Sequence, residues 1–165
     1  MPETSLKYAK TQVVIHWLTL ILLLGSFVSR EAMSSAWEVI TTEGAEGFAP
    51  DIGTRVHVAL GVTILALTLL RIALRIRNGA PPPVEGQHPL ITIASASVHG
   101  LLYLIVLAMP LAGMAAWFGG FGDLADVHGV LFIVLLVLLA AHVAAALFHQ
   151  FVIGDNLLSR MRLKR

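Results

Sequence analysis

The positions of the histidines in this sequence indicate a functional site. The chain has 165 residues and seven histidines, and three of them lie in one almost unbroken apolar stretch, residues 126–151. Ionisable side chains are costly inside a bilayer, so histidines there indicate a functional role. A neutral imidazole can ligate a metal ion through one ring nitrogen. The sequence contains no cysteine, which excludes iron–sulfur clusters, covalently attached haem and thiolate metal sites.

Four apolar segments are long enough to hold these histidines within a membrane. About 20 apolar residues cross a hydrocarbon core of roughly 30 Å, and 57% of this chain is hydrophobic while only 13% is charged. The predicted spans are residues 11–28, 54–76, 90–118 and 124–153. Because lipid offers the backbone no hydrogen bonds, each span must be a helix. We therefore predict an all-α membrane protein, a four-transmembrane-helix bundle that forms a single domain over residues 1–165.

The charges that flank the spans predict the orientation of the bundle. Nine of the eleven Lys and Arg residues lie toward one end, and only Arg30 and Arg55 lie toward the other. By the positive-inside rule, both termini face the cytoplasm. The outer end is acidic and carries Glu31, Glu38, Glu43, Glu46, Asp51, Asp123 and Asp126. An acidic face does not suit nucleic acid or other polyanions.

The predicted helices bring four histidines to two depths. His57 and His128 lie near the outer ends of the second and fourth spans. His142 follows His128 by fourteen residues. At about 1.5 Å per residue it is roughly 21 Å deeper on nearly the same helix face. His16 enters from the cytoplasmic side and reaches a similar depth. Two facing imidazoles at each depth predict two bis-histidine sites for b-type haem, with one ligand of each site on the fourth helix.

Other candidate residues have more than one interpretation at this point. His99, in the third span, lies at the inner depth and is an alternative to His16 as the partner of His142. His149 follows His142 by two turns, and we assign it to a quinone, to a propionate, to a position behind a haem ligand, or to the membrane interface. Trp17 has either a role at a quinone or one as an interfacial anchor.

Arg55 and Arg71 are the cations nearest the two predicted haems. Arg55 precedes His57 by two residues, and Arg71 follows it by fourteen, so they lie near the outer and inner haem respectively. Each is either a propionate ligand or an interfacial side chain whose charged end reaches water. His88, in a proline-rich connection, is expected to be solvated.

Several stretches of the sequence resemble the bacterial cytochrome b561 family. They are YAKTQVVIHWL, RVHVALGVTILALTLLRIALR, VHGLLYLIVLAMPLAGM, and DVHG followed by AHVAAALFHQFVIGDNLLSRM. The resemblance covers nearly the whole chain and implies a dihaem, multi-pass protein of the bacterial inner membrane that carries electrons in respiration. It implies the ligand pairs His16 with His142 and His57 with His128, and so favours His16 over His99.

The resemblance also implies an activity. Some members of the family look like superoxide oxidases, which implies an oxidoreductase that takes electrons from superoxide on the outer side of the membrane and passes them to ubiquinone. The acidic outer face would steer an anion poorly, so a neutral or cationic donor, such as a quinol or a small soluble c-type cytochrome, is a second expectation.

Two other functions are alternatives to a free-standing electron carrier. The chain could be the haem b subunit of a larger membrane dehydrogenase or hydrogenase, with a soluble redox partner. It could also be a transporter that relays metal ions or protons through histidines. Transporters tend to have inverted repeats and broken helices, neither of which is evident here.

Overall fold

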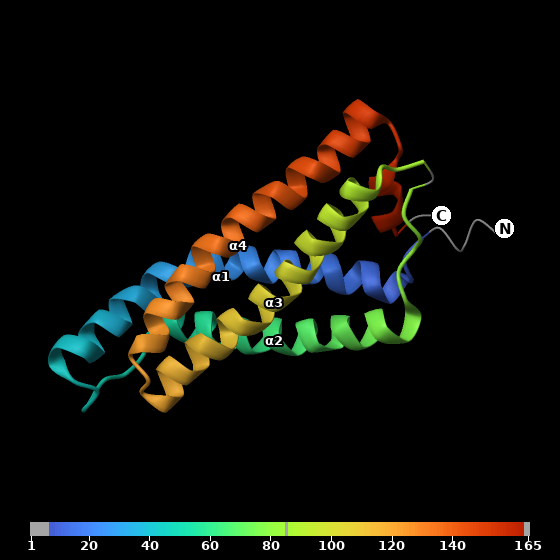
Figure 1. Cartoon of the computed structure of the whole chain (residues 1–165). Coiled ribbons are helices and arrows are strands. Elements are labelled where there is room, and N and C mark those ends of the chain that lie inside the picture. The colour runs from blue at the N-terminus through green and yellow to red at the C-terminus, as the bar shows by residue number, and fades with distance from the viewer. Residues whose placement is uncertain (1–6, 85, 164–165) are drawn as a thin grey trace.

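The computed structural model describes residues 7–84 and 86–163, and it is helical throughout its membrane-length segments (Figure 1). The long helices are α1 (Lys10–Glu43), α2 (Ile52–Asn78), α3 (Pro89–Gly119) and α4 (Asp123–Phe148). A π-helical turn, η2 (His149–Ile153), continues α4, and a 3₁₀ helix, η3 (Leu157–Met161), follows. All four spans are long and apolar enough to cross a membrane. The prediction of an all-α, four-span protein is therefore confirmed.

The first helix differs from the prediction. The other three spans agree closely with α2, α3 and α4 together with η2. α1 instead continues beyond the predicted span 11–28 to Glu43. No glycine or proline interrupts residues 26–43, and the hydroxyls of Thr41 and Thr42 donate to carbonyl oxygens one turn back. The helix ends at Gly44, whose φ of 93° favours glycine.

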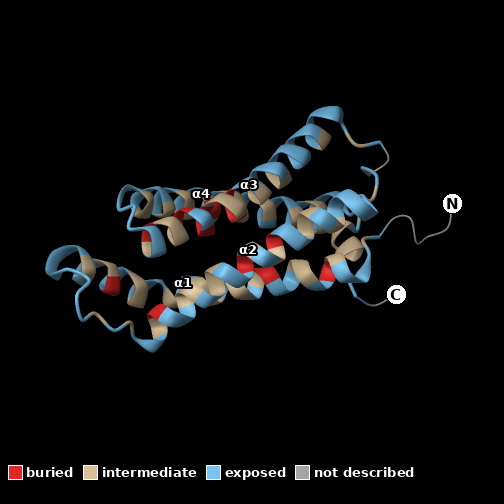
Figure 2. Cartoon of the chain, turned by 90° about the horizontal axis from the view of Figure 1, so that it is seen from below, coloured by how far each residue is buried: buried red, intermediate tan, exposed pale blue. Residues whose placement is uncertain are grey.

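The four helices form two antiparallel pairs. α1 packs against α2, α3 packs against α4, and α2 and α3 make the third main contact, whereas α1 and α4 make few or no close backbone contacts. Figure 2 shows the pairs as two layers. α1 and α2 approach closely at Gly53, where an added Cβ would lie 2.6 Å from the Cβ of Ala32. Small residues allow membrane helices to approach in this way.

The buried core is small and lies in the middle of the bundle. It consists of Ile64, Ile105, Val106, Met109 and Leu135. Many other large apolar residues are exposed, as the pale blue stretches of the ribbon in Figure 2 indicate, and at most 11% of the most apolar part of any span is buried. An apolar surface of this extent is unsuited to water and is covered by lipid tails in a bilayer.

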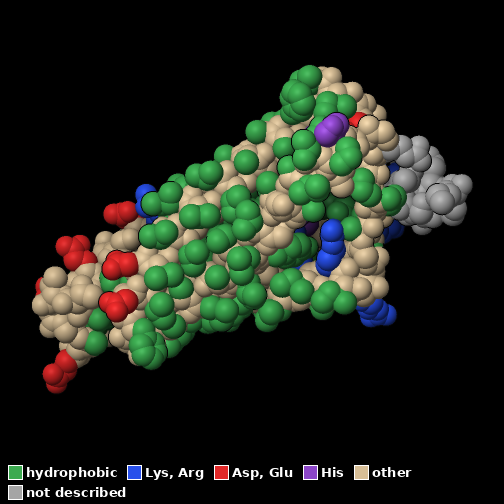
Figure 3. Space-filling view, viewed as in Figure 1, with side chains coloured by type: hydrophobic (Ala, Val, Ile, Leu, Met, Phe, Trp, Pro, Cys, Tyr) green, Lys and Arg blue, Asp and Glu red, His purple; other side chains and the backbone are tan. Residues whose placement is uncertain are grey.

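The two ends of the bundle carry opposite charges (Figure 3). We call the end formed by the α1–α2 and α3–α4 connections the acidic end, and the opposite end, where the described chain starts and finishes, the basic end. The basic end carries Lys7, Lys10, Arg75, Arg77, Arg160 and Arg162. This charge distribution is the one read from the sequence, and the orientation that it predicts, with both termini in the cytoplasm, stays a prediction.

Candidate functional site

One histidine pair lies toward the acidic end, between α2 and α4; we call it the outer pair. The ring centroids of His57 and His128 are 6.3 Å apart, and their planes meet at 68°. Nδ1 of His57 is 3.2 Å from the carbonyl oxygen of Ser26. Nδ1 of His128 is 2.8 Å from the carbonyl oxygen of Met109. Because a carbonyl oxygen only accepts, each Nδ1 carries the proton, and each Nε2 has the free lone pair that binds a metal.

A glycine on α3 makes room for one of these rings. A Cβ added at Gly113 would lie 2.8 Å from Nδ1 and 3.0 Å from Cε1 of His128. Any larger residue would therefore push the ring away from the carbonyl of Met109. Gly113 thus positions the ring of His128, a role that is visible only once α3 and α4 are packed together.

Contacts at the start of α2 fix the position of His57, the second residue of the outer pair. Asp51 caps the helix, because its carboxylate accepts the backbone N–H of Thr54 at 2.7 Å. The hydroxyl of Thr54 donates to the carbonyl of Ala32 on α1 at 3.2 Å. The hydrogen bond from Thr54 lowers the pKa of Asp51. These contacts anchor the first turn of α2, and His57 lies one turn further on.

The second pair lies toward the basic end, between α1 and α4; we call it the inner pair. The ring centroids of His16 and His142 are 6.3 Å apart, and their planes meet at 62°. The ring of His99, on α3, lies 5.1 Å from that of His142, and its Nδ1 is 2.6 Å from the carbonyl oxygen of Ser95. The structure therefore brings three imidazoles together at this level.

The separations distinguish between the two candidate partners of His142. A metal–imidazole bond is about 2.0–2.1 Å long, so two rings that bind one ion from opposite sides have centroids about 6 Å apart. The separation of 6.3 Å between His16 and His142 suits such an ion. The 5.1 Å between His99 and His142 is too short for it. The geometry favours His16 as the partner and places His99 beside the pair.

The inner level contains a cation, Arg71, that contacts His16. No arginine or lysine among the described residues makes such a contact with the outer pair. Nη2 of Arg71 donates to Nδ1 of His16 at 3.0 Å, and its guanidinium carbon lies 5.2 Å from the ring centre of Tyr103. Arg71 is partly buried, and no carboxylate of residues 7–84 or 86–163 forms an ion pair with it. A cation held in this way inside a membrane bundle is suited to binding an anion, such as a haem propionate.

Arg55 and His88 lie nearer the surface. Arg55 donates from Nε to the carbonyl of Pro50 at 3.0 Å. A pocket of about 230 Å³ at the acidic end is lined by Pro50, Thr54, Arg55, Val58, Ala59 and Trp117. His88 is exposed and caps α3, with its Nδ1 accepting the backbone N–H of Leu90 at 3.3 Å. Neither residue contacts a histidine pair, but Arg55, two residues before His57, borders this pocket.

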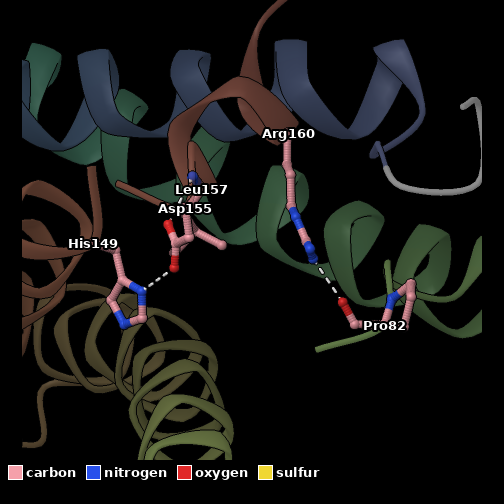
Figure 4. Close-up of polar contacts among 5 residues, drawn as sticks. All are labelled: Pro82, His149, Asp155, Leu157 and Arg160. Atoms are coloured by element: carbon pink, nitrogen blue, oxygen red, sulfur yellow. Dashed lines mark hydrogen bonds and ion pairs between the residues drawn. The ribbon is translucent and has the colours of Figure 1, made fainter. Parts of the chain in front are cut away.

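Two further predicted residues, Trp17 and His149, are held by contacts with the segment that follows α4. Trp17 contacts this segment from α1, and His149 is its first residue. The ring of Trp17 lies 5.4 Å from that of His16, and its Nε1 donates to the carbonyl of Met161 at 3.1 Å. Nδ1 of His149 lies 2.5 Å from Oδ2 of Asp155, as Figure 4 shows. Sequence reasoning missed Asp155, because only the folding back of the chain after η2 brings it to His149.

The residues present fit a haem at each level. Each pair joins the α1–α2 layer to α4, and at the inner level the two helices that it joins make few close backbone contacts. Beside the outer pair, a Cβ at Gly61 or Gly129 would meet no atom within 4 Å. The described residues contain no cluster of three or more His, Cys, Asp or Glu suited to a metal ion. Paired imidazoles without further ligands suit a porphyrin iron better than a metal ion held by protein alone.

Imidazole pairs at two levels of a four-helix membrane bundle define a membrane-bound b-type cytochrome. The sequence matches the prokaryotic cytochrome b561 family over residues 7–163, and the chain belongs to that family. It is therefore a bacterial multi-pass membrane protein of electron transfer, and the family implies haem b as its cofactor.

Individual relatives agree with this assignment over almost the full length. The chain is 35% identical to cytochrome b562 of Cereibacter sphaeroides, with 96% of each chain covered. It is 31% identical to the probable superoxide oxidase CybB of Yersinia pestis, with 96% of this chain and 97% of the relative covered. It is 26% identical to cytochrome b561 homolog 1 of Escherichia coli, with 96% and 98% covered.

Proposed function

We propose that the chain carries electrons across the membrane by means of two b haems. His57 and His128 hold the outer haem, and His16 and His142 hold the inner one. The observation that carries the proposal is the equal centroid separation of 6.3 Å in both pairs. Along α4 the two levels are roughly 21 Å apart, which suits transfer across a bilayer. Each haem would supply a six-coordinate iron that carries one electron.

The four ligands and their neighbours then have distinct tasks. The carbonyls of Ser26 and Met109 hold the outer rings with Nε2 free. Arg71 binds a propionate of the inner haem, because it is the cation without a carboxylate partner beside His16. Arg55 does the same at the outer level or meets the donor there.

The external donor reacts at the acidic end, and superoxide is the donor that the likeness to a probable superoxide oxidase supports. The carboxylates of this end repel an anion, but its two cations, Arg30 and Arg55, lie close in the sequence to residues of the outer level. Arg55 precedes His57 by two residues, and Arg30 follows Ser29, whose hydroxyl oxygen is 3.2 Å from Nδ1 of His57. Local positive charge can therefore attract an anion to the outer haem.

A membrane quinone, ubiquinone in the simplest case, accepts the electrons at the basic end. Trp17 and His149 lie between the inner pair and the C-terminal segment, where a quinone head group would meet them. His99 lies beside His142 and shapes the inner site from α3.

The first experiment is a haem count on the purified protein, made by the pyridine haemochrome method. We expect two b haems per chain and a reduced spectrum of low-spin iron. One haem per chain would mean that one histidine pair is wrongly assigned, and no haem would overturn the proposal. Proteoliposomes that contain ubiquinone then test superoxide against a reduced c-type cytochrome as the external donor, with the variant Arg55→Gln expected to slow superoxide alone.

A further inference from the structure

The chain folds back on itself at the basic end of α4 in an unusual way. The helix widens into the π-helical turn η2, and Gly154 follows with a φ of 75°. Asn156 has a φ of 54° and is the only non-glycine residue with positive φ in the described part of the chain. π-helical turns and left-handed non-glycine residues are energetically costly, and both occur often at functional sites. Here they bring Asp155 against His149.

The resulting pair is well ordered by its contacts. The side chains of His149 and Asp155 are only 12% and 9% exposed, and Nδ1 of the ring is 2.5 Å from Oδ2 of the carboxylate. Oδ1 accepts the backbone N–H of Leu157 at 3.1 Å. Both carboxylate oxygens are therefore occupied, whereas Nε2 of His149 has no hydrogen-bond partner within residues 7–84 and 86–163.

A second polar group beside the pair also lacks a partner. The side-chain oxygen of Gln150 is buried and accepts no hydrogen bond from the described residues. Its Nε2 donates to Oδ1 of Asn156 at 3.2 Å, which fixes the amide. Buried acceptors are nearly always satisfied, so an orphan oxygen here points to a donor that arrives from outside the chain.

The C-terminal segment holds the pair next to the inner level. Arg160 donates from Nη1 to the carbonyl of Pro82 at 2.6 Å (Figure 4), and Trp17 donates to the carbonyl of Met161. His149 follows His142 by seven residues, which is about 10 Å along a helix. His149 therefore lies between the level of His142 and the basic end of the bundle.

We infer that His149 and Asp155 deliver protons from the basic end to the quinone that is reduced at the inner level. This inference rests on the proposed function. Reduction of a quinone to a quinol takes up two electrons and two protons. The inner level provides the electrons one at a time. For each proton, the Nε2–H bond of His149 breaks, an O–H bond forms on a quinone oxygen, and water at the basic end returns a proton to Nε2.

Asp155 acts through His149 and is a positioning residue. Its carboxylate accepts the Nδ1–H of the ring and balances the positive charge that the ring carries when both nitrogens are protonated. Nε2–H is then free to donate to the quinone oxygen. The structure assigns no other carboxylate of the described chain to an ion pair with a histidine.

The variant Asp155→Asn separates proton delivery from binding. The asparagine oxygen accepts from Leu157 and its amide donates to Nδ1 of His149, which leaves a neutral ring with its single proton on Nε2. Such a ring still forms a hydrogen bond to a quinone but cannot release the proton without becoming an anion. We expect the maximal rate to fall about 10- to 100-fold, with quinone affinity nearly unchanged. His149→Gln should behave in the same way, and Asp155→Glu should restore part of the rate.

The measurement uses the full-length holoprotein and needs no physiological donor. The protein is reduced chemically and mixed with decyl-ubiquinone, and reoxidation is followed in a stopped-flow spectrometer over a range of quinone concentrations. Equilibrium dialysis of decyl-ubiquinone against the oxidised protein gives the affinity independently of turnover. Absorption spectra check the haem content of each variant. Arg160→Gln is the control, because it loosens the C-terminal segment without touching the pair.

The outcomes separate the inference from the proposed function. If Asp155→Asn and His149→Gln reoxidise as fast as the wild type, the pair does not deliver protons. An equal loss in Arg160→Gln, or a change in quinone affinity with an unchanged maximal rate, would also overturn the inference, since the segment would then act structurally or the pair only in binding. If the reduced wild type, with both haems present, is not reoxidised by quinone, the proposed function itself fails.

Discussion

The outer and inner histidine pairs have the same ring separation but different surroundings. In the outer pair, backbone carbonyls accept from both Nδ1 atoms, so each ring already exposes a free Nε2 lone pair. In the inner pair, Arg71 donates to Nδ1 of His16. The lone pair of that ring therefore lies on Nδ1, and in the neutral ring the proton lies on Nε2.

Only in the outer pair do both rings already have a free Nε2 lone pair that could bind iron without any change in their hydrogen bonds. At the inner level, Arg71 has to release His16 before its Nε2 can bind a metal. A haem propionate is an anion that could bind the guanidinium of Arg71 in place of His16. Binding of the cofactor would then itself release the ring of His16 to act as a ligand. In the proposed arrangement the same cation lies near the inner haem and favours its reduced state, which would direct electrons inward from the outer level.

The largest expected effect comes from removing one ligand from each level. His128→Ala should abolish the outer haem and leave the inner one, and His142→Ala should do the reverse, because each variant removes one of two axial ligands. His99→Ala is the matched control at the inner level and should keep two haems. The haem count and the reduced spectrum of each variant measure this. Loss of the inner haem in His99→Ala, with retention in His16→Ala, would reverse the assignment of the inner ligand.

A smaller effect is expected from crowding a ligand without removing it. Gly113→Ala places a methyl group 2.8 Å from Nδ1 of His128, so the ring must shift and its bond to Met109 is lost. We expect about 10- to 100-fold weaker binding of the outer haem, measured by titrating the apoprotein with haem. Gly100→Ala, on the same helix, meets no atom within 4 Å and should have no effect. Equal effects of the two changes would show that α3 does not position His128.

Much of the fold and the two-level site could be predicted from the sequence, for a physical reason. Lipid forces apolar spans to be helices, and the rise per residue then sets the depth of every histidine. Depth alone pairs His57 with His128 and places His142 at the inner level. The conflict between His16 and His99 could not be settled by depth, because both lie at the same level; side-chain separation distinguishes them.

Other features depend on local conformation that carries no periodic signal. The extension of α1 to Glu43 was not predicted, because its polar residues are typical of an external loop. These residues include no glycine or proline that would end a helix. Asp155 was missed because its approach to His149 requires the π-helical turn and the left-handed conformation of Asn156. The contact between Arg71 and His16 joins different helices and depends on their packing.

Removing the inner cation tests the electrostatic difference between the levels. Arg71→Gln should lower the midpoint potential of the inner haem, because a nearby positive charge stabilises the reduced state. The expected shift is on the order of 60 mV, the equivalent of about 1.4 kcal/mol, as for a unit charge within roughly 10 Å at an effective dielectric constant near 20. Arg75→Gln, on the same helix but bonded to the hydroxyl of Tyr8, should shift it less. Redox titration would contradict the prediction if the outer haem shifted more than the inner one.

The smallest effect concerns acid stability, and it should appear only at the outer level. The pKa of Asp51 is lowered from its ordinary value of 3.8 by the hydrogen bond from Thr54. A lowered carboxyl pKa stabilises the fold above that value, and the contribution is lost as the pH falls through the folded-state pKa. Asp51→Asn keeps a capping side chain without the titration. The wild type should therefore hold its outer haem slightly more firmly than Asp51→Asn at neutral pH, and the difference should disappear as the pH falls below about 4. The side chain is exposed, so the difference is small, and absorption spectra recorded along an acid titration measure it at both levels. A difference that persists below about pH 4 would mean that Asp51 acts on the outer pair by something other than its charge at the start of α2.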